Sequence, residues 1–96
     1  MSPTLDETQL ASGLATIPNW NIEHGELVRT VTFVDFNRAM NFVNQVAAFA
    51  EGANHHPDID IRYNRVRLAL KTHDADGRIT QKDIDLARSI ETELPK

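Results

Sequence analysis

Two adjacent histidines, His55 and His56, followed by Pro57, are the residues of this chain best suited to chemistry. An imidazole titrates near neutral pH, so it can both donate and accept a proton during a reaction. A third histidine, His73, stands at the far end of the next predicted hairpin, and the fold could bring it back beside the pair. The pattern predicts a site for general acid–base catalysis.

The histidine pair stands at the end of a long amphipathic segment. Glu51 precedes His55 by four residues, so the two side chains would share one face if the helix continued that far. Pro57 disfavours the α conformation of the residue before it, so the helix is expected to end at about His56. A single histidine at a helix end can simply interact with the helix dipole. Two histidines beside Glu51 and Pro57 favour the catalytic interpretation.

Metal binding is the competing interpretation of these residues. Zinc uses histidine, but neighbouring histidines rarely turn toward one metal ion, and no second motif supplies ligands at a recognised spacing. Residues 72–83 resemble an EF-hand calcium loop with Gly77 at its sixth position. However, Thr72 replaces the first carboxylate, Asp83 replaces the bidentate glutamate, and the preceding segment alternates like a strand. We therefore expect a polar turn leading into a helix cap, without a metal ion.

Helices at three places would position these residues. Thr4 and Glu7 form a capping-box pattern before a first helix that stops at Pro18. Asp35 is a good N-cap for a central helix from Phe36 to about residue 53. Thr80 would cap a last helix, with Asp83 completing a capping-box pattern and Pro95 ending the helix.

The central helix carries a broad apolar stripe. Its members recur at helical spacing and are Phe36, Ala39, Met40, Val43, Val46, Ala47 and Ala50. Phe42 and Phe49 fall beside this stripe and would widen it. A second apolar face on so small a domain suggests contact with a partner subunit.

Two hairpins flank the central helix. Residues 20–23 and 27–34 would pair around His24-Gly25, and residues 58–63 and 66–71 around Asn64-Arg65. Ile59, Ile61 and Tyr63 are expected on one side of the second hairpin. Its arginines are expected to form a solvated face or to pair with Asp58 and Asp60; they are Arg62, Arg65 and Arg67.

The element order is therefore α-β-β-α-β-β-α over one domain spanning residues 1–96. It predicts an α+β fold with a four-stranded antiparallel sheet and three helices packed on one face.

The net charge of −4 and the absence of a basic cluster argue against a nucleic-acid or anionic membrane surface. Without cysteines, a signal-like segment or a membrane-length apolar run, the chain is expected to be soluble and cytoplasmic.

Taken together, these residues resemble the pterin-4a-carbinolamine dehydratase family. The family signature is an acidic residue, His-His-Pro, an aromatic residue, a third histidine and an aspartate, matched here by Glu51, His55-His56-Pro57, Tyr63, His73 and Asp83. The resemblance extends over nearly the whole chain, including Trp20 and residues 33–39, 63–66 and 80–87. Residues 76–80 depart from it, being one residue longer than the Gly-Gly-Leu-Thr stretch of many relatives. With the insertion placed there, Asp83 and not Asp85 matches the family aspartate.

The resemblance implies a specific reaction. Members dehydrate a 4a-hydroxytetrahydropterin, the product left by aromatic amino-acid hydroxylases, to the quinonoid dihydropterin, without a metal or cofactor. It makes His56 the leading acid–base residue, with His55 and His73 binding substrate or assisting. Glu51 and Asp83 would orient or electrostatically tune the imidazoles.

The resemblance also bears on assembly. Members form homodimers by joining sheets or homotetramers through helices, so a homo-oligomer is expected. An alternative function on the same scaffold is a non-catalytic interaction, dimerisation or assembly cofactor with a protein partner. The presence of all three histidines, His55, His56 and His73, favours the enzyme, because a pure binding module would not need them.

Overall fold

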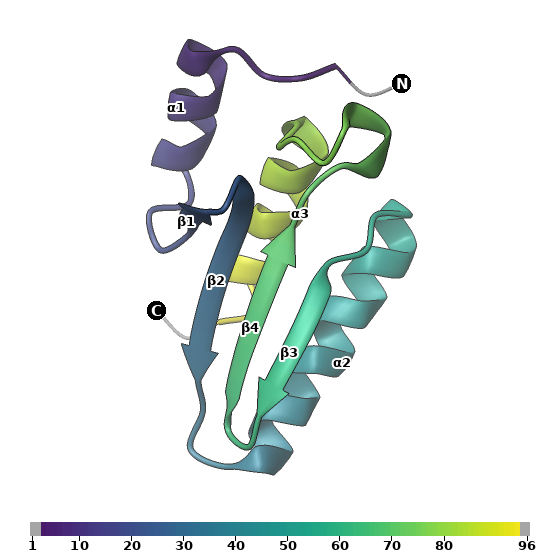
Figure 1. The fold of residues 1–96 in the computed structure, drawn as a ribbon. Helices are drawn as coiled ribbons and strands as arrows, with labels where there is room; N and C mark the ends of the chain where they lie inside the picture. Colours follow the sequence, from purple (N-terminus) through teal and green to yellow (C-terminus); the bar gives the residue numbers. More distant parts are fainter. Residues whose placement is uncertain (1–2, 95–96) are drawn as a thin grey trace.

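Four antiparallel strands form one sheet in the order β1-β2-β4-β3. The computed structural model describes residues 3–94 (Figure 1). The strands are β1 (Asn21–Glu23), β2 (Glu26–Thr32), β3 (Asp58–Arg62) and β4 (Arg65–Leu70), and the helices are α1 (Glu7–Ala15), α2 (Phe36–Ala53), α3 (Gln81–Glu91) and the short 3-10 helix η1 (His73–Ala75). The predicted α-β-β-α-β-β-α order and α+β class are confirmed.

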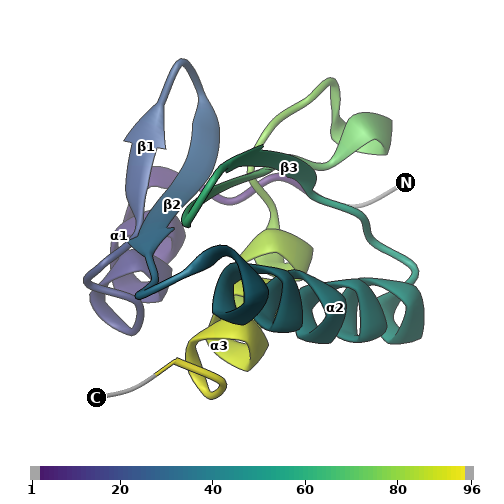
Figure 2. The ribbon, with the colours of Figure 1, turned by 90° about the horizontal axis from the view of Figure 1, so that it is seen from below.

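The helices α1, α2 and α3 lie on one face of the sheet and leave the opposite face uncovered (Figure 2). Alternation along the central strands explains this arrangement, because every second residue points to the same face. Leu27 pairs with Leu70 across β2 and β4, and both are fully buried. The core forms between these strands and the apolar face of α3, which contributes Ile84, Leu86, Ala87 and Ile90.

Helix α2 begins where the sequence predicted, with Asp35 as its N-cap. The Asp35 carboxylate accepts a hydrogen bond of 2.8 Å from the backbone N–H of Arg38. The predicted stripe was only partly right, because Phe42 is buried in the core of this same chain while Phe36 is 49% exposed. The buried residues of α2 are Ala39, Phe42, Val46 and Ala50.

No helix within residues 3–94 is both long and apolar enough to cross a membrane.

The first helix has a different cap from the predicted one. The N-cap of α1 is Asp6, whose side chain accepts a 2.7 Å hydrogen bond from the backbone of Gln9, and Gln9 caps Asp6 in return. Thr4 instead forms an isolated β-bridge with Thr80, which ties the N-terminal segment to the start of α3. The predicted terminator of the last helix, Pro95, lies outside the described residues.

The turn between β3 and β4 also lies one residue earlier than predicted. Arg62 pairs with Arg65, so Tyr63 and Asn64 form the two-residue turn, and Tyr63 adopts a φ of 55°. This conformation points the Tyr63 side chain into solvent, where it is 69% exposed, instead of aligning it with the isoleucines of β3. Asn64 holds the turn against the β2–α2 loop, donating a 2.7 Å hydrogen bond to the carbonyl of Phe33.

Candidate active site

The three histidines of the motif surround one depression of about 270 Å³. His55 and His56 come from the connection between α2 and β3, and His73 begins the 3-10 helix that follows β4. The lining residues are Asn54, His55, His56, Thr72, His73, Asp74 and Lys82. Segments distant in sequence therefore supply a group of imidazoles at one end of the sheet.

The end of α2 sets the position of the histidine pair. Helix α2 ends at Ala53, before the predicted end at about His56, because Asn54 adopts the left-handed conformation with φ 49° and ψ 45°. The N–H of His55 then donates to the carbonyl of Ala50 at 3.0 Å, and that of Asn54 to Glu51 at 3.2 Å. These two bonds form a Schellman motif, which satisfies the last carbonyls of the helix and turns the chain out of its axis.

This turn separates His55 from Glu51. The shared helix face was expected only if the helix continued to His55, and α2 ends before that residue. The carboxylate of Glu51 instead contacts the Nε2 atom of His56. Both side chains are well exposed, at 78% for Glu51 and 55% for His56, so this imidazole is open to solvent and to a ligand in the depression.

His55, unlike the exposed His56, is buried. Its Nε2–H donates a 2.5 Å hydrogen bond to Oδ1 of Asp83, which is completely buried in the first turn of α3. His55 itself is only 9% exposed. A buried donor and a buried carboxylate that satisfy each other give this imidazole a single orientation.

Asp83 is held in turn by two threonines. Its Oδ2 atom accepts from the hydroxyl of Thr72 at 2.9 Å and from the backbone N–H of Thr80 at 2.8 Å. Because the Thr72 proton is used there, the Thr80 hydroxyl donates to the Thr72 oxygen across 2.7 Å. The predicted capping role of Asp83 is therefore present, together with a contact to His55.

His73 is positioned by the loop that follows β4. Thr72 and Arg78 form a β-bridge that closes this loop, and the N–H of Gly77 donates to the carbonyl of Thr72 at 3.1 Å. Asp76 and Gly77 complete the turn with φ values of 57° and 74°. The segment with the apparent extra residue is thus a closed loop that leaves the exposed His73 beside the depression.

Sequence reasoning missed four residues that line the depression. They are Asn54, Thr72, Asp74 and Lys82. Asn54 and Thr72 directly precede motif histidines, which was the available signal. Lys82 could not be found by spacing alone, because it reaches the depression only after α3 packs against the end of α2.

The arrangement of side chains suits proton transfer. One imidazole, His55, is fixed by a buried carboxylate, while His56 and His73 are exposed beside the same depression.

Within residues 3–94, no group of three or more histidine, cysteine, aspartate or glutamate side chains could hold a metal ion. In the loop that resembled a calcium site, the Asp83 oxygens already accept bonds from His55, Thr72 and Thr80.

Comparison with known proteins places the chain in a family. The family model for pterin 4 alpha carbinolamine dehydratase matches residues 3–93. A relative from Chloroflexus aurantiacus, provisionally named as such a dehydratase, is 55% identical over 93% of this chain and 95% of its own length. A similarly named protein from Acidobacterium capsulatum is 60% identical over 84% of this chain and 87% of its own length.

A solved structure agrees with these sequence matches. It is the crystal structure of a transcriptional coactivator/pterin dehydratase from Brucella melitensis, which is 32% identical. It superposes with a TM-score of 0.87 over 94% of this chain and 97% of the other. Together, the fold, the histidine motif and these matches show that the chain belongs to the pterin 4 alpha carbinolamine dehydratase family.

Proposed function

We propose that this protein dehydrates a 4a-hydroxytetrahydropterin to the quinonoid dihydropterin. The observation that carries the proposal is the convergence of His55, His56 and His73 on one depression in a chain of this family. The reaction breaks the C4a–O bond, removes the proton from N5 and forms a C4a–N5 double bond, so that one water molecule leaves. The hydroxyl becomes a good leaving group only when it receives a proton, and histidine can supply one near neutral pH.

His56 is the acid–base residue in this proposal. Its side chain is 55% exposed, so it can exchange protons with substrate and solvent, and Glu51 limits the orientations of its ring. His73 lies across the same depression and is placed to bind the substrate or to assist proton transfer.

His55 has the role of a fixed binding group. Its Nε2 atom is committed to Asp83, so only the other ring nitrogen remains for a ligand. Asp83 is a positioning residue that acts through His55, and Thr72 acts through Asp83. Such a chain of buried hydrogen bonds maintains geometry without rearrangement during the reaction.

The test is a spectroscopic assay with freshly prepared 4a-hydroxytetrahydropterin, followed with and without a chelator. The proposal expects acceleration over the spontaneous dehydration that survives chelation and is lost in His56→Ala. No acceleration by a folded sample would contradict the enzymatic function and favour the alternative of an interaction or assembly protein. The histidine mechanism would be wrong if His56→Ala kept normal turnover.

A protein partner is the second candidate function, and one surface favours it. Three of the five large apolar side chains exposed within residues 3–94 lie near the β3–β4 turn and the β2–α2 loop, which Asn64 and Phe33 join. They are Val34, Phe36 and Tyr63. A pull-down with Tyr63→Ser and Phe36→Ser variants that keep dehydratase activity would separate partner binding from catalysis.

We also propose that the protein is a homodimer or homotetramer. Strand β3 lies at an edge of the sheet, so its outer backbone groups have no strand partner within residues 3–94. Such edges pair readily with another chain. Light scattering on the purified protein gives the mass directly, and a monomer at working concentration would contradict the proposal.

A further inference from the structure

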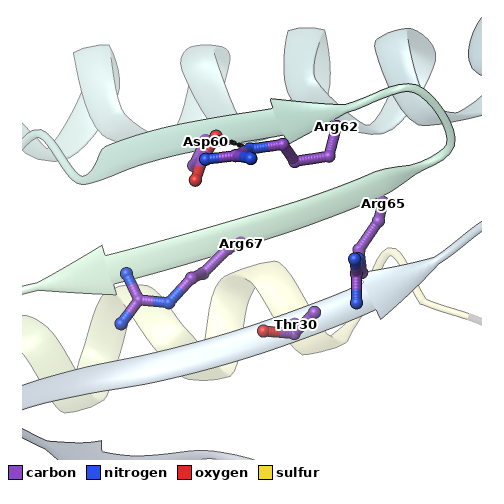
Figure 3. Close-up of a pocket in the computed structure, with 5 residues that line it drawn as sticks. All are labelled: Thr30, Asp60, Arg62, Arg65 and Arg67. Atoms are coloured by element: carbon purple, nitrogen blue, oxygen red, sulfur yellow. Dashed lines mark hydrogen bonds and ion pairs between the residues drawn. The ribbon is translucent and has the colours of Figure 1, made fainter.

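The face of the sheet opposite the helices carries a cluster of arginines on adjacent strands. Figure 3 shows Arg65 and Arg67 on β4 on either side of Thr30 of β2, and Arg62 on β3 extending along its strand to Asp60, with helices behind the sheet. These residues and Asp60 line a shallow depression of about 210 Å³. Arg62, Arg65 and Arg67 form what we call the arginine cluster.

The register of the sheet places like charges together in this cluster. Arg62 pairs directly with Arg65 across β3 and β4, and Arg67 follows two residues later on the same face. Like charges directly opposite each other in an antiparallel pair destabilise it. The two-residue turn imposes this pairing, so the like charges carry a cost in the free energy of folding.

The protein's own carboxylates neutralise the cluster only weakly. Asp60 contacts Arg62 at 3.3 Å and Glu23 contacts Arg67 at 3.4 Å, both longer than the usual charge-assisted hydrogen bond of about 2.8 Å. The side chains of both pairs are between 41% and 76% exposed. Within residues 3–94, Arg65 forms no ion pair. The five lining residues thus carry two more positive than negative charges. Arg62 and Arg67 each use one donor in these contacts, and their other guanidinium donors and those of Arg65 are available.

We propose that the arginine cluster binds a phosphate-type oxyanion. A phosphate group carries up to two negative charges and accepts hydrogen bonds on all its oxygens, which matches several guanidinium forks and the Thr30 hydroxyl. A volume of about 210 Å³ equals that of roughly seven water molecules, enough for one phosphate group. It is smaller than the roughly 300–1,000 Å³ of pockets for drug-sized ligands, so the remainder of a larger ligand would extend over the sheet.

The surroundings of the cluster limit the ligand to a small molecule. Acidic side chains border the cluster on the same face: Glu23 contacts Arg67, while Asp58 and Glu26, which stands opposite Lys71, lie farther from the β3–β4 turn. Together with the net charge of −4, they would repel an extended polyanion such as a nucleic acid. Two kinds of small ligand carry such an oxyanion, namely free inorganic phosphate and the phosphoryl group of a phosphomonoester.

The site is independent of the proposed catalysis. Arg65 and Arg67 lie in the half of β4 nearest the β3–β4 turn, whereas His73 follows the far end of β4. Loss of binding at the cluster can therefore be measured without any assay of turnover.

The experiment is a titration of the isotope-labelled full-length protein with inorganic phosphate or AMP, followed by NMR at low ionic strength. We expect saturable shifts centred on Thr30, Arg62, Arg65 and Arg67. Arg65→Gln and Arg67→Gln should each weaken binding about tenfold, as the loss of one charge-assisted contact implies. Arg38→Gln removes the same charge from the first turn of α2, on the helix side of the sheet, and should leave binding unchanged.

Comparing the affinities for phosphate and AMP shows which of these two kinds of ligand the cluster binds. Equal affinities for phosphate and AMP would identify a free oxyanion site, and tighter AMP binding with added shifts at Tyr63 would identify a phosphomonoester site. The proposal is overturned if sodium chloride of equal ionic strength reproduces the shifts, or if Arg38→Gln weakens binding as much as Arg65→Gln does. A normal thermal transition of each variant ensures that lost binding does not reflect unfolding.

Discussion

Oδ1 of Asp83 lies 2.5 Å from Nε2 of His55, although 28 residues separate them in the sequence. The same carboxylate receives the backbone N–H of Thr80 as a helix cap and the hydroxyl of Thr72. The same carboxylate therefore both caps α3 and orients the buried imidazole. Asp83 links the stability of the last helix to the geometry of the histidine site.

His56→Ala should abolish most of the proposed dehydration while the protein remains folded. Removal of a general acid–base group typically lowers the rate about 10²- to 10⁴-fold. His56 is largely exposed, so the free energy of unfolding should change by less than about 0.5 kcal/mol. Initial rates and urea denaturation measure the two effects. His24→Ala, at an exposed turn, serves as the matched control and should keep normal turnover.

Asp83→Asn should damage both stability and turnover. The amide keeps the size of the side chain but presents an N–H₂ group where the carboxylate accepts hydrogen bonds, so the loss in unfolding free energy should be about 3 kcal/mol. His55 would lose its orienting partner, which NMR of the imidazole nitrogens reports directly. Asp85→Asn, at an exposed position two residues away, should be nearly neutral. Equal stability of the two variants would contradict the role assigned to Asp83.

Thr72→Val should destabilise the protein by about 1–3 kcal/mol, because the isosteric side chain neither donates to Asp83 nor accepts from Thr80. Chemical denaturation measures this loss. Turnover should also fall at temperatures where the variant is fully folded, since the Asp83 carboxylate loses one of its donors. Thr32→Val on an exposed position of β2 is the control. Unchanged kcat in folded Thr72→Val would show that the hydroxyl has a purely structural role.

Asn54→Val should destabilise the protein by about 1–2 kcal/mol, because a β-branched residue fits poorly in the left-handed conformation that ends α2. Asn54→Gly should leave the stability almost unchanged, since glycine adopts this conformation readily. Thermal melting of the pair separates backbone strain from loss of the side chain. The interpretation fails if the glycine variant is the less stable of the two.

Local signals were sufficient for most of the fold. Asp35 caps α2 and Thr80 with Asp83 caps α3 as predicted, because a cap involves residues only a few positions apart. The alternation of Val66, Leu68 and Leu70 likewise identified the buried face of β4. The predicted cap of the first helix was wrong: Asp6 caps α1, and Thr4 instead pairs with Thr80 from the other end of the chain, a contact that local spacing does not reveal.

The sequence by itself determined the element order, the family resemblance and the identity of the candidate histidines. These depend on residue types and on spacings along one segment. Only the tertiary structure decided the partners of those histidines. A left-handed turn at Asn54 directs His56 toward Glu51 and His55 toward Asp83. The packing of α3 against α2 then buries one imidazole and leaves the other exposed, a difference that no spacing between adjacent residues can encode.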